Sequence, residues 1–245
     1  MPAGTGAALV VGAGDATGGA IARAFAREGL TACITRRARH LDELQALAAS
    51  IEADGGKARA FGVDARDEAE TAALFETIEK EVGPLEVCVF NIGANVRFPI
   101  TEMTDQVYRK VWEMAAYAGF LAGREAARVM SPRGRGTIIF TGATAAVRGG
   151  SGFAAFAGAK HALRALSQSM ARELGPKGIH VAHVVIDGAI DSAFIREMLP
   201  DADERRARDA LLVPGEIAKN YVWLHKQHRS AWTHELDLRP WCETW

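Results

Sequence analysis

Residues 7–20 read AALVVGAGDATGGA, and this stretch decides the fold. Its first five residues are continuously apolar, which is typical of a strand that is buried on both faces. A glycine-rich turn follows, and residues 18–29, GGAIARAFAREG, then place apolar side chains at helical spacing. Such a turn allows either close packing of helix on strand or close approach of the backbone to a phosphate. Its position between a strand and a helix favours a phosphate loop.

The same order of strand and helix continues along the chain. Further strands are predicted at residues 31–35, 58–64, 85–91, 136–142 and 179–186, which are apolar, rich in β-branched residues and bounded by glycine or polar residues. Between them lie amphipathic segments such as residues 67–83, which end at Gly83-Pro84, a helix stop. This alternation implies right-handed crossovers and a parallel sheet covered on both faces. We predict a doubly wound, Rossmann-type α/β fold of three layers, α/β/α, as a single domain over residues 1–245.

Residues 193–214 interrupt this rhythm. Their sequence, AFIREMLPDADERRARDALLVP, contains no strand pattern and predicts one or two helices outside the sheet. We expect this segment to cover a substrate.

Composition limits the classes of partner. The 245 residues carry a net charge of −1, which gives no electrostatic case for binding nucleic acid or an anionic membrane. No apolar run approaches the ~18 residues of a membrane span. The three cysteines are widely spaced and form no C-x-x-C pair, which favours a reducing compartment. We therefore expect a cytoplasmic protein. His225 and His228 have helical spacing but no H-E-x-x-H motif, so we expect no metal site.

Four motifs, in order and spanning nearly the whole chain, resemble those of the classical short-chain dehydrogenase/reductase family. Residues 11–18 are similar to its T-G-x-x-x-G-x-G loop, with Val and Ala replacing the Thr and the middle Gly. VDARD, residues 63–67, resembles the family's adenine-binding segment. FNIG, residues 90–93, resembles its N-N-A-G motif. DGAIDS, residues 187–192, resembles P-G-x-I-x-T, which implies that the Ile190 backbone and the Ser192 hydroxyl hold a nicotinamide carboxamide.

The resemblance implies a nicotinamide dinucleotide cofactor. The second strand ends in Thr35 and is followed by Arg36-Arg37, which could pair with a 2′-phosphate, whereas an acidic residue there would bind a ribose diol. Asp15 opposes this, because relatives that prefer the phosphate often carry a basic residue at that position, and Arg36 could instead be a solvated start of the next helix. We favour NADP(H) and leave NAD(H) open. We expect the cofactor to contact Gly12, Gly14, Asp15, Thr17, Gly18, Arg36, Asp64, Ala65, Asn91, Gly93, Lys160, Gly188, Ile190 and Ser192.

The family's catalytic residues are Asn, Ser, Tyr and Lys, and the motifs locate each position in this chain. The Y-x-x-x-K pair corresponds to Phe156 and Lys160, one helical turn apart. The serine position holds Ala143, and the asparagine position on the fourth helix holds Ala116. Three of the four functional groups are therefore absent, and phenylalanine cannot donate a proton.

Lys160 and three further side chains are candidates for catalysis. Substitute donors are Thr144, Tyr117 and Asp187, which replaces a proline close to the nicotinamide. Each also has a structural interpretation: Thr144 would bond the strand end, Tyr117 would pack between helices, and Asp187 would cap the following loop. A solvated position would likewise account for Lys160.

Two functions remain open at this point. One is an NAD(P)(H)-dependent oxidoreductase that acts on a small organic substrate by a non-standard proton route, with iminium ions or activated enones as acceptors of hydride. The alternative is a dinucleotide-binding pseudoenzyme that serves as a sensor or partner subunit. The resemblance further implies a homotetramer or homodimer formed through the fourth and fifth helices.

Overall fold

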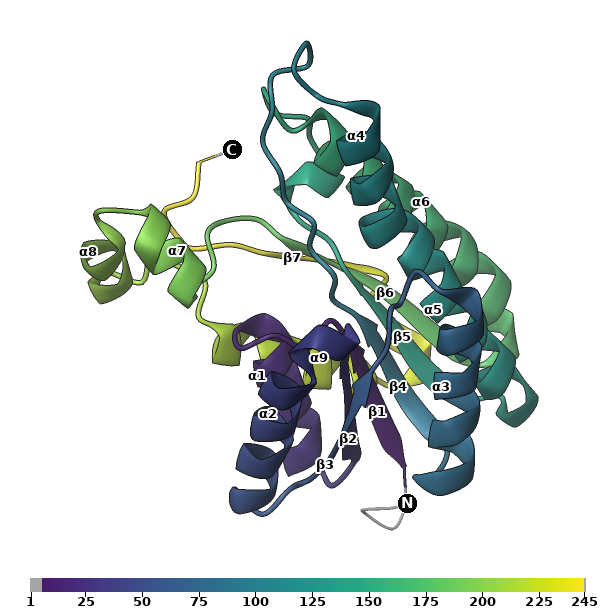
Figure 1. Ribbon diagram of the computed structural model, residues 1–245. Coiled ribbons are helices and arrows are strands. Elements are labelled where there is room, and N and C mark those ends of the chain that lie inside the picture. The colour runs from purple at the N-terminus through teal and green to yellow at the C-terminus, as the bar shows by residue number, and fades with distance from the viewer. Residues whose placement is uncertain (1–5, 245) are drawn as a thin grey trace.

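The strands of the protein form one parallel sheet in the order β3-β2-β1-β4-β5-β6-β7 (Figure 1). The computed structural model describes residues 6–244. Within them the strands are β1 (Ala7–Val11), β2 (Thr31–Arg36), β3 (Lys57–Gly62), β4 (Leu85–Phe90), β5 (Gly136–Thr141), β6 (Ile179–Ile186) and β7 (Glu235–Leu238). The predicted doubly wound α/β fold is confirmed, and β3 shows the largest shift in boundaries, because residues 63 and 64 belong to the turn that follows it.

Helices cover both faces of the sheet. In the same described range they are α1 (Thr17–Arg27), α2 (Leu41–Ala53), α3 (Glu68–Glu81), α4 (Asp105–Trp112), α5 (Ala118–Met130), α6 (Ala154–Leu174), α7 (Ala193–Met198), α8 (Ala202–Ala207) and α9 (Pro214–Lys226). Figure 1 shows α1, α2 and α9 on one side of the sheet and α3, α5 and α6 on the other.

Strand β1 shows why its sequence is continuously apolar. All five of its residues are buried, and they alternate between two cores. Ala8 and Val10 pack in the core beneath α1, α2 and α9, whereas Leu9 and Val11 pack in the core beneath α3, α5 and α6. A strand with a helical layer on each side has no solvated face, so no position selects a polar residue.

Strand β1 is also the place where the strand order changes direction. Its residue Val11 is in register with Thr35 of β2 on one side and with Phe90 of β4 on the other. The chain leaves these carboxyl ends toward opposite faces of the sheet, and a crevice opens between the two connections. The crevice positions the candidate site.

The segment at residues 193–214 forms α7 and α8, which lie away from the sheet in Figure 1. The prediction of one or two helices outside the sheet is confirmed, and the function of this segment as a substrate cover stays a prediction. In residues 6–244, no helix combines the length and the apolar character that crossing a membrane would require.

Candidate active site

The turn between β1 and α1 has a shape that requires glycine at two positions. Gly12 has a φ of +92°, and its carbonyl oxygen accepts a hydrogen bond of 3.0 Å from the Asn91 side chain. At Gly18, a Cβ atom would lie 2.4 Å from that same carbonyl oxygen. Gly14 differs, because a Cβ there would meet no atom within 4 Å. The backbones of the turn and helix α1 therefore touch at Gly12 and Gly18, which leaves the outer side of the turn accessible.

The start of α1 has unused hydrogen-bonding groups. No side chain caps the helix at Ala16, and its first turn holds no acidic residue. The Thr17 hydroxyl is buried and has no hydrogen-bond partner within residues 6–244. An uncapped helix N-terminus with an orphan hydroxyl and a glycine cradle fits an anionic group such as a diphosphate.

Two adjoining cavities extend from this turn along the carboxyl ends of the strands. The larger has a volume of about 670 Å³ and the smaller about 210 Å³, and Gly12, Gly14 and Asn91 line both. The expected cofactor contacts all line one cavity or both. Those in the larger are Gly12, Gly14, Asp15, Thr17, Gly18, Asn91, Gly93, Lys160, Gly188, Ile190 and Ser192. Arg36, Asp64 and Ala65 line the smaller.

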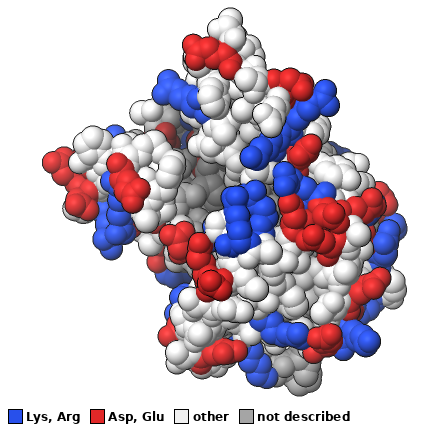
Figure 2. Space-filling model, viewed as in Figure 1, with Lys and Arg blue, Asp and Glu red and all other residues white. Residues whose placement is uncertain are grey.

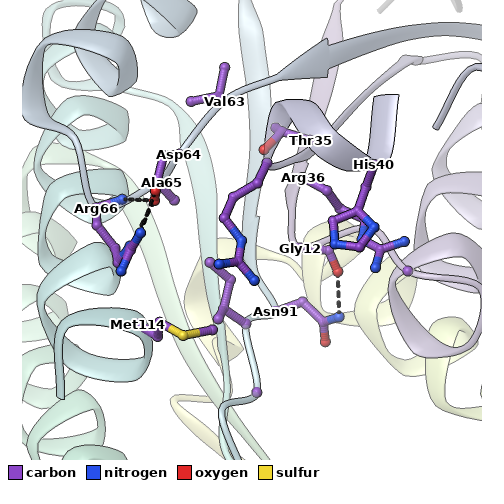
Figure 3. A pocket seen from close by; sticks show the side chains of 14 residues that line it. Gly12, Thr35, Arg36, His40, Val63, Asp64, Ala65, Arg66, Asn91 and Met114 are labelled. Carbon is purple, nitrogen blue, oxygen red and sulfur yellow. Dashed lines mark hydrogen bonds and ion pairs between the residues drawn. The ribbon is translucent and has the colours of Figure 1, made fainter. Parts of the chain in front are cut away.

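The smaller cavity is rich in arginine. Figure 3 shows Asp64 and Arg66 on one side of it and Arg36 and His40 on the opposite side. Arg66 donates two hydrogen bonds to Asp64, Nε to Oδ1 at 2.9 Å and Nη2 to Oδ2 at 2.6 Å, and these bonds hold the pKa of Asp64 below its usual value. Arg37 also lines this cavity, and burial together with neighbouring arginines lowers the pKa of its guanidinium.

Positive charge therefore gathers at this end of the groove. Figure 2 shows basic side chains along one rim of the central hollow. The engagement of Asp64 by Arg66 was not foreseen in the sequence, although the VDARD segment contains both residues.

Lys160 lies at the base of the larger cavity. It projects from α6, is buried, and donates hydrogen bonds to the carbonyl oxygens of Ile92 at 3.0 Å and Thr141 at 2.8 Å. Burial lowers the pKa of this ammonium from its usual value to about 7. Phe156, one turn earlier on α6, lines the same cavity, and the centre of its ring lies 5.8 Å from Lys160 Nζ. The two side chains thus share one face of α6 at the cavity wall.

Thr144 lines the larger cavity and contacts Asp187, which is not among the residues that line either cavity. The Thr144 hydroxyl donates a hydrogen bond of 2.5 Å to Asp187 Oδ1, and Asp187 is buried directly after β6. Arg148 donates to the same oxygen at 3.3 Å, while Nη2 of Arg239 lies 3.5 Å from Oδ2. The hydroxyl therefore bonds a carboxylate rather than the end of the strand. Sequence reasoning missed both arginines, and the only signal was that Arg148 follows the carboxyl end of β5.

Tyr117 requires a correction, because the structure does not bring it to this site. It lines neither cavity, and its side chain is exposed, with its ring centre 6.2 Å from that of Phe120. Residues Glu113–Tyr117 form a π-helical turn between α4 and α5, within which Ala116 faces inward and Tyr117 faces outward. This outward orientation gives no support to Tyr117 as a proton donor.

His225 and His228, which have helical spacing in the sequence, each contact a hydroxyl group. His225 Nδ1 lies 2.9 Å from the Thr137 hydroxyl, and His228 Nδ1 lies 2.8 Å from the Ser230 hydroxyl. No cluster of three or more potential metal ligands occurs in the part of the chain that the structure describes.

Comparisons with known proteins agree with this geometry. A family model described as short chain dehydrogenase matches residues 6–203. A solved short-chain dehydrogenase from Rhodopseudomonas palustris is 48% identical, with a TM-score of 0.83 and coverage of 97% of this chain and 99% of that one. A metagenomic short-chain oxidoreductase solved with NADP is 25% identical, with a TM-score of 0.82 over 98% and 99% of the two chains. The short-chain reductase protein NovJ of Streptomyces niveus is 32% identical over 87% of this chain and 78% of its own length.

Proposed function

The chain belongs to the short chain dehydrogenase family, and on that premise we propose that it is an oxidoreductase that transfers hydride between NADP(H) and a small organic substrate. The orphan Thr17 hydroxyl, the uncapped start of α1 and the glycine cradle support the binding of a dinucleotide diphosphate. When bound, the dinucleotide supplies or accepts the hydride. One related structure contains NADP, which agrees with this choice.

Arginines at the smaller cavity support the preference for NADP(H) over NAD(H). Arg36, Arg37 and Arg66 line it, and the last residues of β2, Thr35 and Arg36, include no acid that would bind a ribose diol. Arg66 is engaged by Asp64, and Arg36 by Glu43. Arg37 makes no hydrogen bond or ion pair with the described residues 6–244, so its guanidinium is the one we assign to a 2′-phosphate.

A substituted proton route is the finer part of the proposal. We assign Phe156 to the position of the family's tyrosine, Ala143 to that of its serine and Ala116 to that of its asparagine. The observation that carries the alternative is the 2.5 Å hydrogen bond from the Thr144 hydroxyl, at the wall of the larger cavity, to the buried Asp187. In the oxidative direction the Thr144 oxygen takes the proton of the substrate while its own proton passes to Asp187. Reduction reverses both transfers.

This route favours particular substrates. Two arginines flank the Asp187 carboxylate, and the Thr144 hydroxyl donates its proton to that carboxylate rather than into the cavity. Ketone reduction needs a proton on oxygen as hydride arrives, whereas an iminium ion or an activated enone accepts hydride without simultaneous protonation of an oxygen. Lys160 places a buried amino group at the base of this cavity, and the apolar ring of Phe156 lines the wall beside it. We therefore propose iminium or enone substrates.

The test is a set of initial rates with NADPH and matched imine, enone and ketone substrates, followed by the loss of NADPH absorbance. We expect the imine or the enone to react at least ~10-fold faster than the ketone, since general acid catalysis contributes roughly 10²–10⁴-fold where it is present. Thr144→Val lowers the residual rate with the ketone, whose oxygen needs the proton, and Thr144→Ser, which keeps the hydroxyl, retains that rate. A ketone that reacts as fast as the imine contradicts the proposal. Binding of NADPH without any turnover favours a sensor or partner subunit.

The proposal also assigns functions to helix α7 and to the exposed side chains of α4 and α5. Phe194 and Ile195 of α7 line the larger cavity, which supports α7 as part of a substrate cover. On α4 and at the start of α5, the side chains of Trp112 and Phe120 are exposed, which supports self-association through these helices as a homodimer or homotetramer. Light scattering of the purified protein tests this, and a monomer at all concentrations would contradict it.

A further inference from the structure

One cation lies at the mouth of the larger cavity, away from the arginines of the smaller one. Of the charged side chains that line the larger cavity within residues 6–244, Asp15 belongs to the phosphate loop and Lys160 bonds two carbonyl oxygens at the base. The third is Arg148, in the connection between β5 and α6. Its side chain is 41% exposed, so it is open to a ligand in the cavity.

Asp187 binds Arg148 through only one of the nitrogen atoms of its guanidinium group. The carboxylate accepts one hydrogen bond from Arg148 Nη2, at 3.3 Å, while it also accepts the Thr144 hydroxyl and pairs with Arg239. A guanidinium carries five N–H donors in a planar fork that matches a carboxylate. Within the described part of the chain, the other donors of Arg148 make no hydrogen bond. A positioned guanidinium with free donors is suited to bind an anion.

The rest of this part of the cavity is apolar. Phe153 and Phe156 line it from the start of α6, and Phe194 and Ile195 line it from α7. These side chains bury a hydrophobic body but offer no hydrogen bond to it. A ligand that matches both Arg148 and these apolar side chains carries one anionic group and an apolar part of a few carbon atoms or a ring.

We propose that the substrate is a carboxylate with an apolar body, and that Arg148 binds the carboxylate while Phe153 and Phe194 contact the body. The inference rests on the proposed function, because it identifies the substrate class of the same cavity. Arg148 is a specificity-determining residue in this account. It fixes the substrate beside Thr144, since Thr144 and Arg148 share one oxygen of Asp187.

Calorimetric titration with 3-phenylpropionate and its amide, 3-phenylpropionamide, tests the inference. The two probes have the same body and differ in charge. Each is added to the full chain with and without saturating NADPH, for the wild type, Arg148→Met, Arg148→Lys and Arg97→Met. Arg97 is the matched control, because it lies 5.8 Å from the Phe153 ring but does not line the cavity.

We expect the wild type and Arg97→Met to bind the carboxylate about tenfold more tightly than the amide, the range of a charge-assisted bidentate contact. In Arg148→Met this ratio falls to about one, whereas Arg148→Lys keeps part of it, and NADPH binds all four proteins equally. Equal affinity for both probes, a preference that survives in Arg148→Met, or a loss of NADPH affinity in Arg148→Met would overturn the inference. If NADPH binds but neither probe does, the inference fails and the cofactor assignment stands. If the carboxylate preference depends on Arg148 but NADPH does not bind, the inference stands and the proposed function fails.

Discussion

The two ends of the groove differ in what they demand of the sequence. At the phosphate loop, Gly12 and Gly18 are needed because backbone lies against backbone, and these are the first and last glycines of the family's loop pattern. At the other end, Phe156 and Ala143 line the cavity where the resemblance leads us to expect hydroxyl groups. The comparison teaches that cofactor binding rests on backbone shape while chemistry rests on a few functional groups. A chain can therefore keep the first and change the second.

The largest expected effect comes from a substitution in the phosphate loop. Gly18→Ala places a Cβ 2.4 Å from the Gly12 carbonyl oxygen and 2.7 Å from Ala13 Cα, so the turn must shift. We expect NADPH affinity to fall by roughly 100-fold or more, because the diphosphate depends on this turn. Fluorescence titration measures the loss. Gly14→Ala is the control, since no atom lies within 4 Å of its Cβ. Equal behaviour of the two variants would contradict our account of the loop.

The second prediction introduces hydroxyl groups at the end of the groove that contains Phe156 and Ala143. Phe156→Tyr together with Ala143→Ser returns a phenol beside Lys160 and a hydroxyl at the cavity wall. We expect ketone reduction with NADPH to rise by about 10²-fold, the low end of the contribution of a general acid. Steady-state rates at fixed NADPH provide the measurement. If a folded double variant binds NADPH and shows no gain, our placement of the catalytic positions is wrong.

A third prediction sharpens the role of the arginines. Arg37→Met removes the guanidinium that we assign to the 2′-phosphate, and we expect NADPH to bind about tenfold more weakly while NADH is unaffected. Arg39→Met is the matched control, because Arg39 is exposed and does not line the cavity. Competition titrations with the two dinucleotides measure the ratio. An equal loss for NADPH and NADH would contradict selection through the phosphate.

The fourth prediction concerns folding stability rather than ligand affinity, through the cost of burying Lys160. Its pKa is about 7 in the folded protein and 10.5 in the unfolded chain, so between these values the unfolded state binds the extra proton. Burial of Lys160 therefore costs no stability above pH 10.5, where the side chain is neutral in both states. The cost grows as the pH falls from 10.5 to 7, because the unfolded chain then binds a proton that the folded protein does not. Relative to Lys160→Met, the free energy of unfolding of the wild type should therefore rise with pH, by up to about 1.4 kcal/mol per pH unit. Urea unfolding at pH 7 and pH 9 measures this difference. A difference that does not change with pH would show that Lys160 stays charged throughout this range.

Much of the fold could be predicted, because β1, β2, β4, β5 and β6 are buried along most of their length and leave an apolar signature, whereas β3 is only partly buried. Strand β7, ELDL, has only four residues, two of them acidic, and nothing in its apolar pattern marks it. The groove could also be predicted, because loops at the carboxyl ends of parallel strands converge.

What could not be predicted depends on long-range contacts and on helix register. Asp187 meets Arg148 and Arg239, which come from three separate connections, and no local pattern announces this cluster. Tyr117 faces outward because it directly follows Ala116, which faces the core, and consecutive residues of a helix point in different directions.

Fluorescence titration of the purified chain with NADPH and NADH tests the central claim most directly, because the proposed hydride transfer depends on a dinucleotide binding in the groove. We predict saturable binding of both, with NADPH about tenfold tighter owing to its extra phosphate. A correctly folded protein that binds neither dinucleotide would contradict the claim.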